Sequence, residues 1–214
     1  GGGEMQKKVL PKGSQDFLAA IAAHVPRTLR GWTLAGGTGL AMHLGHRLSE
    51  DFDFFKTTAA DLNRLLETLR ALGPSEVLQE ENRTLTLLLK ALKLSFFLIR
   101  DPFVFPTASY SFFEVADVRD IALMKLVAIA NRGSRKDFVD LYCILRRGQG
   151  LQELFSWLPG KYGKGRVNEY QLLKSLCFFE DAEQEPQPIM LEPCNWQECK
   201  AFFLRDARAI ILPP

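Results

Sequence analysis

Apolar residues recur with two different periods along this chain. From residue 75 to residue 99 they alternate with polar residues or form short blocks, which predicts strands at residues 75–80, 83–89 and 92–99. Lys90-Ala91 is the expected tight turn between the last two strands, although it lacks the glycine that such turns favour. Elsewhere the spacing is helical, and helices are predicted at residues 14–24, 58–72, 134–145, 151–158, 170–180 and 195–210. A further helix ends at residue 130 and is capped by either Asp117 or Asp120.

The two periods divide the chain into two parts. All predicted strands lie before about residue 105, so we expect an α+β head at residues 5–105 and an all-helical part at residues 106–214. Two serines are placed to start helices: Ser14 is a candidate N-cap, and the segment from Ser134 to Asp137 resembles a capping box.

Composition adds several limits. A net charge of +2 over 214 residues lacks the strong basic bias of an extended nucleic-acid-binding surface. No apolar segment is long enough to span a membrane. The four cysteines form no CxxC pair and have no zinc spacing, so we expect a reducing compartment and a cytoplasmic protein. Cys194 and Cys199 flank Trp196 and leave a disulfide open. Gly1-Gly2-Gly3 resembles an expression remnant, which would put the natural start at Met5.

A glycine-rich turn and two aspartates carry the strongest chemical signal. Gly36-Gly37-Thr38-Gly39 lies between a predicted short strand and a predicted helix. Asp51 and Asp53 follow in a segment that alternates acidic and aromatic residues, so in a strand both carboxylates would face one side. Each half alone has an ordinary explanation, a strand-to-helix connection or a solvated strand edge. Together, two oxygen donors beside backbone N–H groups predict a site for Mg²⁺ carrying a phosphate chain.

Two segments resemble a known family. The first runs from Gly36 to Phe55 and reads GGTGLAMHLGHRLSEDFDFF, and the second runs from Asp120 to Tyr142 and reads DIALMKLVAIANRGSRKDFVDLY. They are similar to the motifs of the AbiEii/AbiGii toxin-type nucleotidyltransferases, which belong to the DNA polymerase β-like nucleotidyltransferase superfamily. Residues 178–183 are a softer third match, and the resemblance covers roughly residues 10–205.

The resemblance implies a fold and an activity. The fold is a nucleotidyltransferase-like mixed sheet packed by helices, with the helical part closing the cleft. The activity is metal-dependent transfer of a nucleoside monophosphate from a nucleoside triphosphate (NTP), with Mg²⁺ or Mn²⁺, to an acceptor hydroxyl on RNA, for example tRNA, or on a protein. The resemblance also implies the toxin of a toxin–antitoxin or phage-defence pair, and therefore an antitoxin partner.

Roles for residues of the first segment follow from this resemblance. Gly36, Gly37 and Thr38 would hold the triphosphate through backbone N–H groups and a hydroxyl. Asp51 and Asp53 would hold the metal and take part in catalysis.

In the second segment the resemblance implies catalytic roles for Lys125 and Asp137, with the Lys125 ammonium group contacting phosphate, and phosphate binding by Arg132. From the pattern alone, Lys125 lies in an apolar helical run and would more readily extend its ammonium group to solvent. Asp137 also fits the capping box of the next helix, and the two roles are compatible. Asp140 is spaced for a weak surface pair with Lys136.

Ser95 leaves the activity open. The superfamily carries a third carboxylate on a neighbouring strand, and Ser95 stands at the matching position of the strand at residues 92–99. A serine hydroxyl is a neutral, poor metal ligand. The alternative to a transferase is therefore an NTP-binding module with little or no turnover, and a structural helper in a complex is a third function class.

Overall fold

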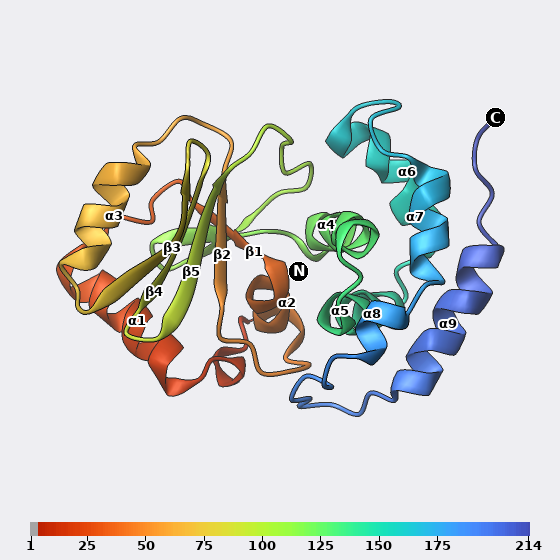
Figure 1. Cartoon of the computed structure of the whole chain (residues 1–214), viewed down its shortest axis with the longest axis horizontal. Coiled ribbons are helices and arrows are strands. Elements are labelled where there is room, and N and C mark those ends of the chain that lie inside the picture. The colour runs from red at the N-terminus through yellow and green to blue at the C-terminus, as the bar shows by residue number, and fades with distance from the viewer. Residues whose placement is uncertain (1–3) are drawn as a thin grey trace. The chain divides into compact units, whose positions relative to one another are not determined.

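The computed structural model describes residues 4–214, and the predicted expression remnant at residues 1–3 lies outside the described residues. The chain forms two compact units, the first ending at Asp117 and the second spanning Val118–Pro214. The first unit contains a mixed sheet with helices, and the second is helical (Figure 1). The predicted α+β class with a helical C-terminal part is confirmed.

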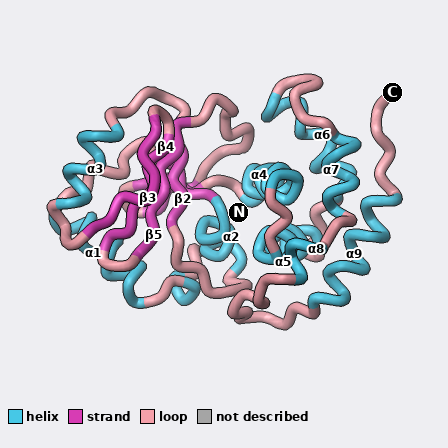
Figure 2. The backbone as a smooth tube through the Cα atoms, in the orientation of Figure 1, coloured by secondary structure: helices cyan, strands magenta, loops and turns pink. Residues whose placement is uncertain are grey.

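Within residues 4–214, seven strands form one sheet in the order β3-β4-β5-β2-β1-β7-β6. Its strands are β1 (Thr33–Ala35), β2 (Phe52–Lys56), β3 (Ser75–Glu81), β4 (Thr84–Leu89), β5 (Leu92–Leu98), β6 (Ala108–Tyr110) and β7 (Phe113–Val115). The pairs β2–β5 and β1–β7 are parallel and the other neighbours are antiparallel, so the sheet is mixed. Figure 2 shows the strands of the sheet in magenta.

Strand β2 shows the predicted alternation. Phe52 and Phe54 are fully buried, and their rings stack with centroids 5.9 Å apart. The Phe54 ring also stacks on Phe96 of β5, with ring centroids 5.4 Å apart. The centroids of the Phe52 and Phe17 rings are 5.5 Å apart. Because successive strand residues point to opposite faces, Asp53 is directed away from this aromatic core.

The helical elements of the first unit are the short 3₁₀ helix η1 (Lys7–Val9), α1 (Lys12–His24), α2 (Gly36–Leu44) and α3 (Leu62–Arg70). Helices α1 and α3 cover one face of the sheet and α2 lies on the other (Figure 1). The prediction that Ser14 caps α1 was wrong, because the helix starts at Lys12 and the Ser14 hydroxyl donates to the carbonyl of Glu50 at 3.3 Å. Helix α3 is shorter than predicted and begins after its N-cap Asp61.

The tight turn at Lys90-Ala91 joins β4 to β5 as predicted. Both residues have positive φ, 50° for Lys90 and 67° for Ala91. A two-residue hairpin needs this left-handed geometry to match the strand twist, even where no glycine is present.

The strands β6 and β7 were not predicted from the sequence. Each is three residues long, too short for a readable period, and β7 is held by parallel pairing with β1. They extend the first unit to Asp117, whereas the sequence placed the boundary at residue 105. That the helical part closes a cleft stays a prediction.

The second unit consists of helices. They are α4 (Val118–Asn131), α5 (Arg135–Leu145), α6 (Leu151–Tyr162), α7 (Glu169–Leu176), α8 (Glu180–Glu183) and α9 (Trp196–Arg208). Ser134 caps α5 as predicted, accepting a hydrogen bond from the Asp137 N–H at 3.3 Å. The helix predicted at residues 170–180 is instead divided into α7 and α8.

Two expectations from composition can be compared with the structure. No helix within residues 4–214 is both long and apolar enough to cross a membrane. The cysteines Cys143, Cys177, Cys194 and Cys199 are all free thiols, so the disulfide left open between Cys194 and Cys199 is absent.

Candidate active site

The glycine turn forms the start of α2. Its N-cap is Ala35, whose side chain makes no capping hydrogen bond. The first N–H groups of a helix have no acceptor within the helix, and together with the helix dipole they favour an anion. The residues that the sequence assigned to the triphosphate therefore lie at the end of a helix suited to phosphate.

Gly36 and Asp53 are in direct contact across this helix start. A Cβ atom at Gly36 would lie 2.7 Å from Oδ2 of Asp53, and Gly36 has a φ of +62°. Any larger residue would collide with the carboxylate and also strain the backbone. The structure thus brings the first glycine of the turn together with the second aspartate of the Asp-x-Asp pair.

Asp51 is placed differently from the prediction. It precedes β2, which begins at Phe52, and its side chain is exposed, whereas Asp53 is half-buried within the strand. The expectation that both aspartates share one strand is therefore wrong in detail, because pairing with β1 begins only at Asp53.

The hydroxyl of Thr38 is engaged inside the fold. Thr38 is buried, it donates a hydrogen bond to the carbonyl oxygen of Asp51, and its oxygen lies 2.6 Å from the Ser49 hydroxyl. These contacts tie the segment before β2 to the start of α2. Thr38 therefore positions Asp51, and its backbone N–H is the group left at the helix start.

Ser95 lies next to Asp53 on the neighbouring strand. The two residues are direct partners in the parallel β2–β5 pair, so their side chains share a face. Ser95 is buried, with its hydroxyl 3.1 Å from the Thr86 hydroxyl of β4. Ser95 occupies the position at which the superfamily carries a third carboxylate. Its side chain is buried and does not lie on an outer, solvated face.

The residues at this site fit a magnesium ion that also binds phosphate. No group of three or more His, Cys, Asp or Glu side chains within residues 4–214 is arranged to hold a metal alone. Mg²⁺ commonly uses one or two carboxylates and completes its shell with water and substrate phosphates. Asp53, close to the start of α2, is one such carboxylate, and Asp51, whose backbone carbonyl accepts from Thr38, is the candidate for the second.

A second cluster of charged residues lies in the helical unit. The Lys125 ammonium group is 2.9 Å from Oδ1 of Asp137 and 2.8 Å from Oδ2 of Asp140, and the exposed fractions of these side chains are 6%, 1% and 0%. The interpretation of Lys125 as extending to solvent is wrong, because the ammonium group is buried. Asp140 is likewise no surface partner of Lys136, since it is buried against Lys125.

Arg132 joins the same cluster from the outside. Arg132 directly follows α4, which ends at Asn131. Its guanidinium group donates two hydrogen bonds to the Asp137 carboxylate, from Nε to Oδ2 at 2.7 Å and from Nη2 to Oδ1 at 3.0 Å. The Arg132 side chain is 66% exposed. Lys125 and Arg132 therefore both bind Asp137.

Asp137 is held as a carboxylate. Burial by itself would raise its pKa, but Lys125 and the Arg132 hydrogen bond outweigh burial and lower the pKa from 3.8 to about 2. Ser134 contributes a further hydrogen bond, from its hydroxyl to Oδ2 at 2.7 Å. A carboxylate with several donors favours its charged form.

Asp140 is the residue of this cluster that sequence reasoning missed. It lies three residues after Asp137, so both face the same side of α5. An isolated lysine in an apolar helix, followed by two acids at that spacing, was the available signal for a buried ion pair.

Comparison with known families gives a match that covers the residues of both clusters. Residues 17–210 match the family described as "Nucleotidyl transferase AbiEii toxin, Type IV TA system". The chain belongs to the AbiEii nucleotidyltransferase toxin family. The AbiEii match spans the glycine turn, the aspartates, and the Lys125–Asp137–Asp140 cluster.

Other relatives of this AbiEii-family chain include an uncharacterized protein of Aquifex aeolicus. It is 38% identical over 180 residues, which covers 82% of this chain and 85% of the relative. JHP933 of Helicobacter pylori is similar in structure, with a TM-score of 0.51, 16% identity, and coverage of 94% of this chain and 92% of that one. MenT4, a nucleotidyltransferase toxin of Mycobacterium tuberculosis, has a TM-score of 0.52, 16% identity, and coverage of 92% and 84%. At these identities the two structures show a shared fold.

Proposed function

We propose that this AbiEii-family protein transfers a nucleoside monophosphate from an NTP to an acceptor hydroxyl, with release of pyrophosphate. The observation that carries the proposal is the contact between Gly36 and Asp53 at the start of α2. It places a carboxylate beside backbone N–H groups suited to a phosphate chain. Family membership supports the same reaction class.

The proposed roles in the first unit follow from position. The backbone of Gly36, Gly37 and Thr38 binds the triphosphate, and Asp51 and Asp53 hold Mg²⁺ or Mn²⁺. When bound, such a metal would neutralise phosphate charge and lower the pKa of the acceptor hydroxyl. The Thr38 hydroxyl keeps the Asp51 segment in place.

The proposed roles in the helical unit are divided between its two cations. Arg132, with its exposed guanidinium group, is the residue suited to contact phosphate. Lys125 is buried between two acids and acts as a positioning residue for Asp137. This assignment gives Arg132 the contact with phosphate that the resemblance implied for Lys125.

The acceptor is proposed to be RNA or a protein hydroxyl, and the partner an antitoxin encoded with this chain. The type IV toxin–antitoxin description of the family supports the second part. Expression of the chain should slow growth of a bacterial host, and co-expression of the adjacent gene should restore it. Growth unaffected by expression would argue against the toxin role.

Transfer from radiolabelled NTPs to total RNA and to protein tests the activity. Asp53→Asn keeps the size of the side chain and removes its charge, so we expect at least a hundredfold loss of transfer with an unchanged thermal midpoint. The matched control is Asp16→Asn, at an exposed aspartate of α1. Full transfer by the Asp53→Asn variant would remove this residue from the active site.

A second candidate function is an NTP-binding module with little turnover. Ser95, in place of a third carboxylate beside Asp53, favours it. Calorimetry with each NTP and Mg²⁺ distinguishes the two functions, since a module binds NTP without releasing pyrophosphate. Absence of NTP binding at millimolar concentration would contradict both.

A further inference from the structure

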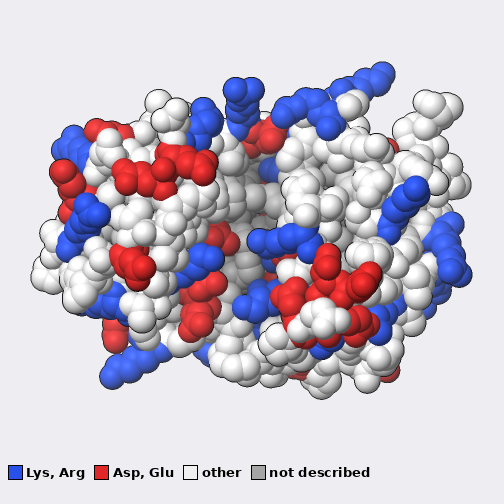
Figure 3. Space-filling view, in the orientation of Figure 1, with Lys and Arg blue, Asp and Glu red and all other residues white. Residues whose placement is uncertain are grey.

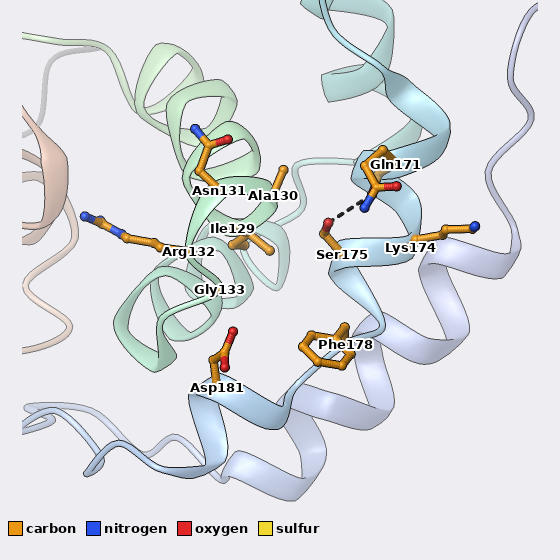
Figure 4. A pocket seen from close by; sticks show the side chains of 10 residues that line it. All are labelled: Ile129, Ala130, Asn131, Arg132, Gly133, Gln171, Lys174, Ser175, Phe178 and Asp181. Atoms are coloured by element: carbon orange, nitrogen blue, oxygen red, sulfur yellow. Dashed lines mark hydrogen bonds between the residues drawn. The ribbon is translucent and has the colours of Figure 1, made fainter.

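Two cysteines of the helical unit lie next to each other although they are distant in the sequence. Cys143 is fully buried in α5, and Cys194 is half-buried directly before Asn195, the N-cap of α9. The Cys143 S–H donates a hydrogen bond to the Cys194 sulfur. Neither cysteine lines the pocket between the end of α4 and α7–α8, which includes Arg132 and Lys174 (Figure 4), so the thiol pair is a separate feature of this unit.

Two arginines at the end of α5 hold the segment before α9 in this position. Arg146 donates to the carbonyl oxygen of Pro193 at 3.0 Å, and Arg147 donates to the carbonyl oxygen of Cys143 at 2.8 Å. Both guanidinium groups also bind the Glu192 carboxylate, each at 2.7 Å. Because Arg146 follows Cys143 by three residues, the segment that it holds lies on the side of α5 that carries the Cys143 thiol.

The surroundings of the two sulfur atoms make the thiols chemically unequal. The hydrogen bond from Cys143, together with the Arg146 guanidinium group, lowers the pKa of the Cys194 thiol from 9.0 to about 7, against the effect of burial. The same hydrogen bond and burial raise the pKa of Cys143. The thiolate is the reactive form of cysteine, so Cys194 is the more nucleophilic of the two near neutral pH.

A buried amide lies against Cys194. The Gln187 Nε2 atom donates to the Cys194 carbonyl oxygen at 3.4 Å, and the amide also hydrogen-bonds the Cys194 sulfur. The Gln187 Oε1 atom is buried and has no hydrogen-bond partner in the part of the chain that the structure describes. A buried acceptor without a donor is costly, and an S–O–H group on Cys194 would supply that donor. The amide is therefore a sign, independent of the thiol pair, that this sulfur can carry a hydroxyl group.

The other two cysteines have different surroundings. Cys199 is fully buried, its thiol donates to the Phe138 carbonyl oxygen at 3.8 Å, and burial raises its pKa. Burial also raises the pKa of Cys177, although Cys177 is half-buried as Cys194 is. Cys177 is therefore a matched control for the reactivity of Cys194.

The charge of the nearby surface favours a neutral oxidant. Exposed acids gather over α8, where Glu180, Asp181 and Glu183 lie (Figure 3). The Glu183 carboxylate accepts a hydrogen bond from Nε1 of Trp196 at 3.1 Å, which puts this acidic surface beside the start of α9 and near Cys194. Negative charge repels anionic disulfides such as oxidised glutathione. Hydrogen peroxide is uncharged and small enough to reach a half-buried sulfur.

We propose that Cys194 and Cys143 form a modification site for hydrogen peroxide, in which Cys194 reacts first and Cys143 then closes a reversible disulfide. The proposal goes beyond the proposed function and does not rest on it. Reversible disulfides of this kind occur in reducing compartments, where they act as redox sensors.

Two balanced steps form the disulfide. The Cys194 thiolate attacks the peroxide: an S–O bond forms, the O–O bond breaks, and the leaving hydroxide takes up the proton that the thiol had released and becomes water. The sulfur is oxidised to a sulfenic acid and the peroxide is reduced. The Cys143 sulfur then attacks the Cys194 sulfur, so that an S–S bond forms and the S–O bond breaks. The departing hydroxide takes the Cys143 proton and leaves as a second water.

Peptide mapping by mass spectrometry on the full chain tests the site. Reduced protein is treated with a small excess of hydrogen peroxide, the remaining thiols are alkylated, and a glutamate-specific protease cleaves after Glu198 to separate Cys194 from Cys199. We expect a linked Cys143–Cys194 peptide as the main disulfide and its disappearance with dithiothreitol. A Cys194–Cys199 link, or oxidation of Cys194 without any linked peptide, would overturn the proposal.

Variants distinguish the roles of the two thiols. Cys194→Ser should abolish disulfide formation. Cys143→Ala should leave Cys194 as a sulfenic acid, which dimedone labels. The control Cys177→Ser should form the disulfide at the rate of the wild type. Disulfide formation that needs Cys177, or a Cys194→Ser variant oxidised as fast as the wild type, would contradict the assignment.

The wild-type chain also gives a measurement that needs no buried substitution. At pH 7, iodoacetamide should alkylate Cys194 at least about tenfold faster than Cys177, because a larger fraction of Cys194 is thiolate. Equal rates at the two cysteines would remove Cys194 as the reacting thiol.

Discussion

At the scale of single residues, Lys125 is the buried cation that pairs with two buried carboxylates. Its ammonium group lies between the carboxylates of Asp137 and Asp140 in the helical unit. Replacing it by methionine keeps the helix propensity and the stem but leaves two buried acids short of a cation. We expect Lys125→Met to lower the free energy of unfolding by about 3 kcal/mol, because breaking a buried pair leaves an uncompensated charge.

Denaturant unfolding measures this loss, and Lys136→Met is the matched control. Lys136 is an exposed lysine of α5, so its substitution should change stability by less than about 0.5 kcal/mol. A Lys125→Met variant as stable as the wild type would show that the cluster contributes nothing to folding.

Asp137 gives the fold a pH dependence of known sign. Its pKa falls from 3.8 to about 2 on folding, so the unfolded chain binds more protons between these values. The stabilisation, about 2 kcal/mol in full, is present above pH 4 and is lost as pH falls toward 2. We expect roughly half of it to be lost between pH 5 and pH 3. Denaturant unfolding of the wild type and of Asp137→Asn over this range checks the prediction, since the difference between them should shrink as pH falls.

At the scale of elements, the β4–β5 hairpin carries a local backbone cost. Lys90 and Ala91 both adopt left-handed φ values, which disfavour any residue with a Cβ atom by roughly 1–2 kcal/mol. Ala91→Gly removes that cost but makes the unfolded chain more flexible. We expect a net gain of about 0.5 kcal/mol in the free energy of unfolding.

The control for the hairpin substitution is Ala71→Gly. Ala71 is the C-cap of α3 with a right-handed φ of −66°, so glycine relieves nothing there and should lower stability by about 0.5 kcal/mol. Equal effects of the two glycines on the denaturation midpoint would contradict the assigned turn geometry.

The starts of two helices were predicted at residues whose side chains cap them, although the start of α3 was placed too early despite its N-cap Asp61. Ser134 and Asn195, which start α5 and α9, accept hydrogen bonds from N–H groups three residues on, at 3.3 and 3.0 Å. Helix α1 was misplaced because its N-cap, Pro11, makes no side-chain hydrogen bond. The division between α7 and α8 was missed because no glycine or proline marks it.

At the scale of the whole molecule, the small net charge limits how RNA can bind. With +2 over the full chain, an RNA acceptor is expected to contact few phosphates. Between 50 and 200 mM salt its affinity should fall by roughly seven- to twentyfold, the value for two or three neutralised phosphates of a single strand. Filter binding of a single-stranded RNA oligonucleotide checks this. A fall of a thousandfold or more would indicate an extended basic surface.

The α+β class, most helices and the partnership of the glycine turn with the aspartates were accessible from the sequence. They depend on short-range physical causes: the period of apolar residues, capping side chains, and glycine where φ is positive. The sequence could indicate only that Gly36 and Asp53 lie in the same region. How closely they approach depends on the pairing of β1 and β2, which leaves 2.7 Å between Oδ2 of Asp53 and a Cβ atom placed on Gly36.

Tertiary structure alone decided the remaining features. The partners of Lys125 come from the next helix, and no local pattern distinguishes an ammonium group that reaches solvent from one that meets Asp137 and Asp140. The strands β6 and β7 exist because β1 offers a free edge to pair with, which three-residue segments cannot reveal by themselves. The sequence by itself determined which side chains can do chemistry, because that depends on their types and short spacings. Packing determined which of those side chains are engaged with each other, because buried charges and strand edges are satisfied by residues distant along the chain.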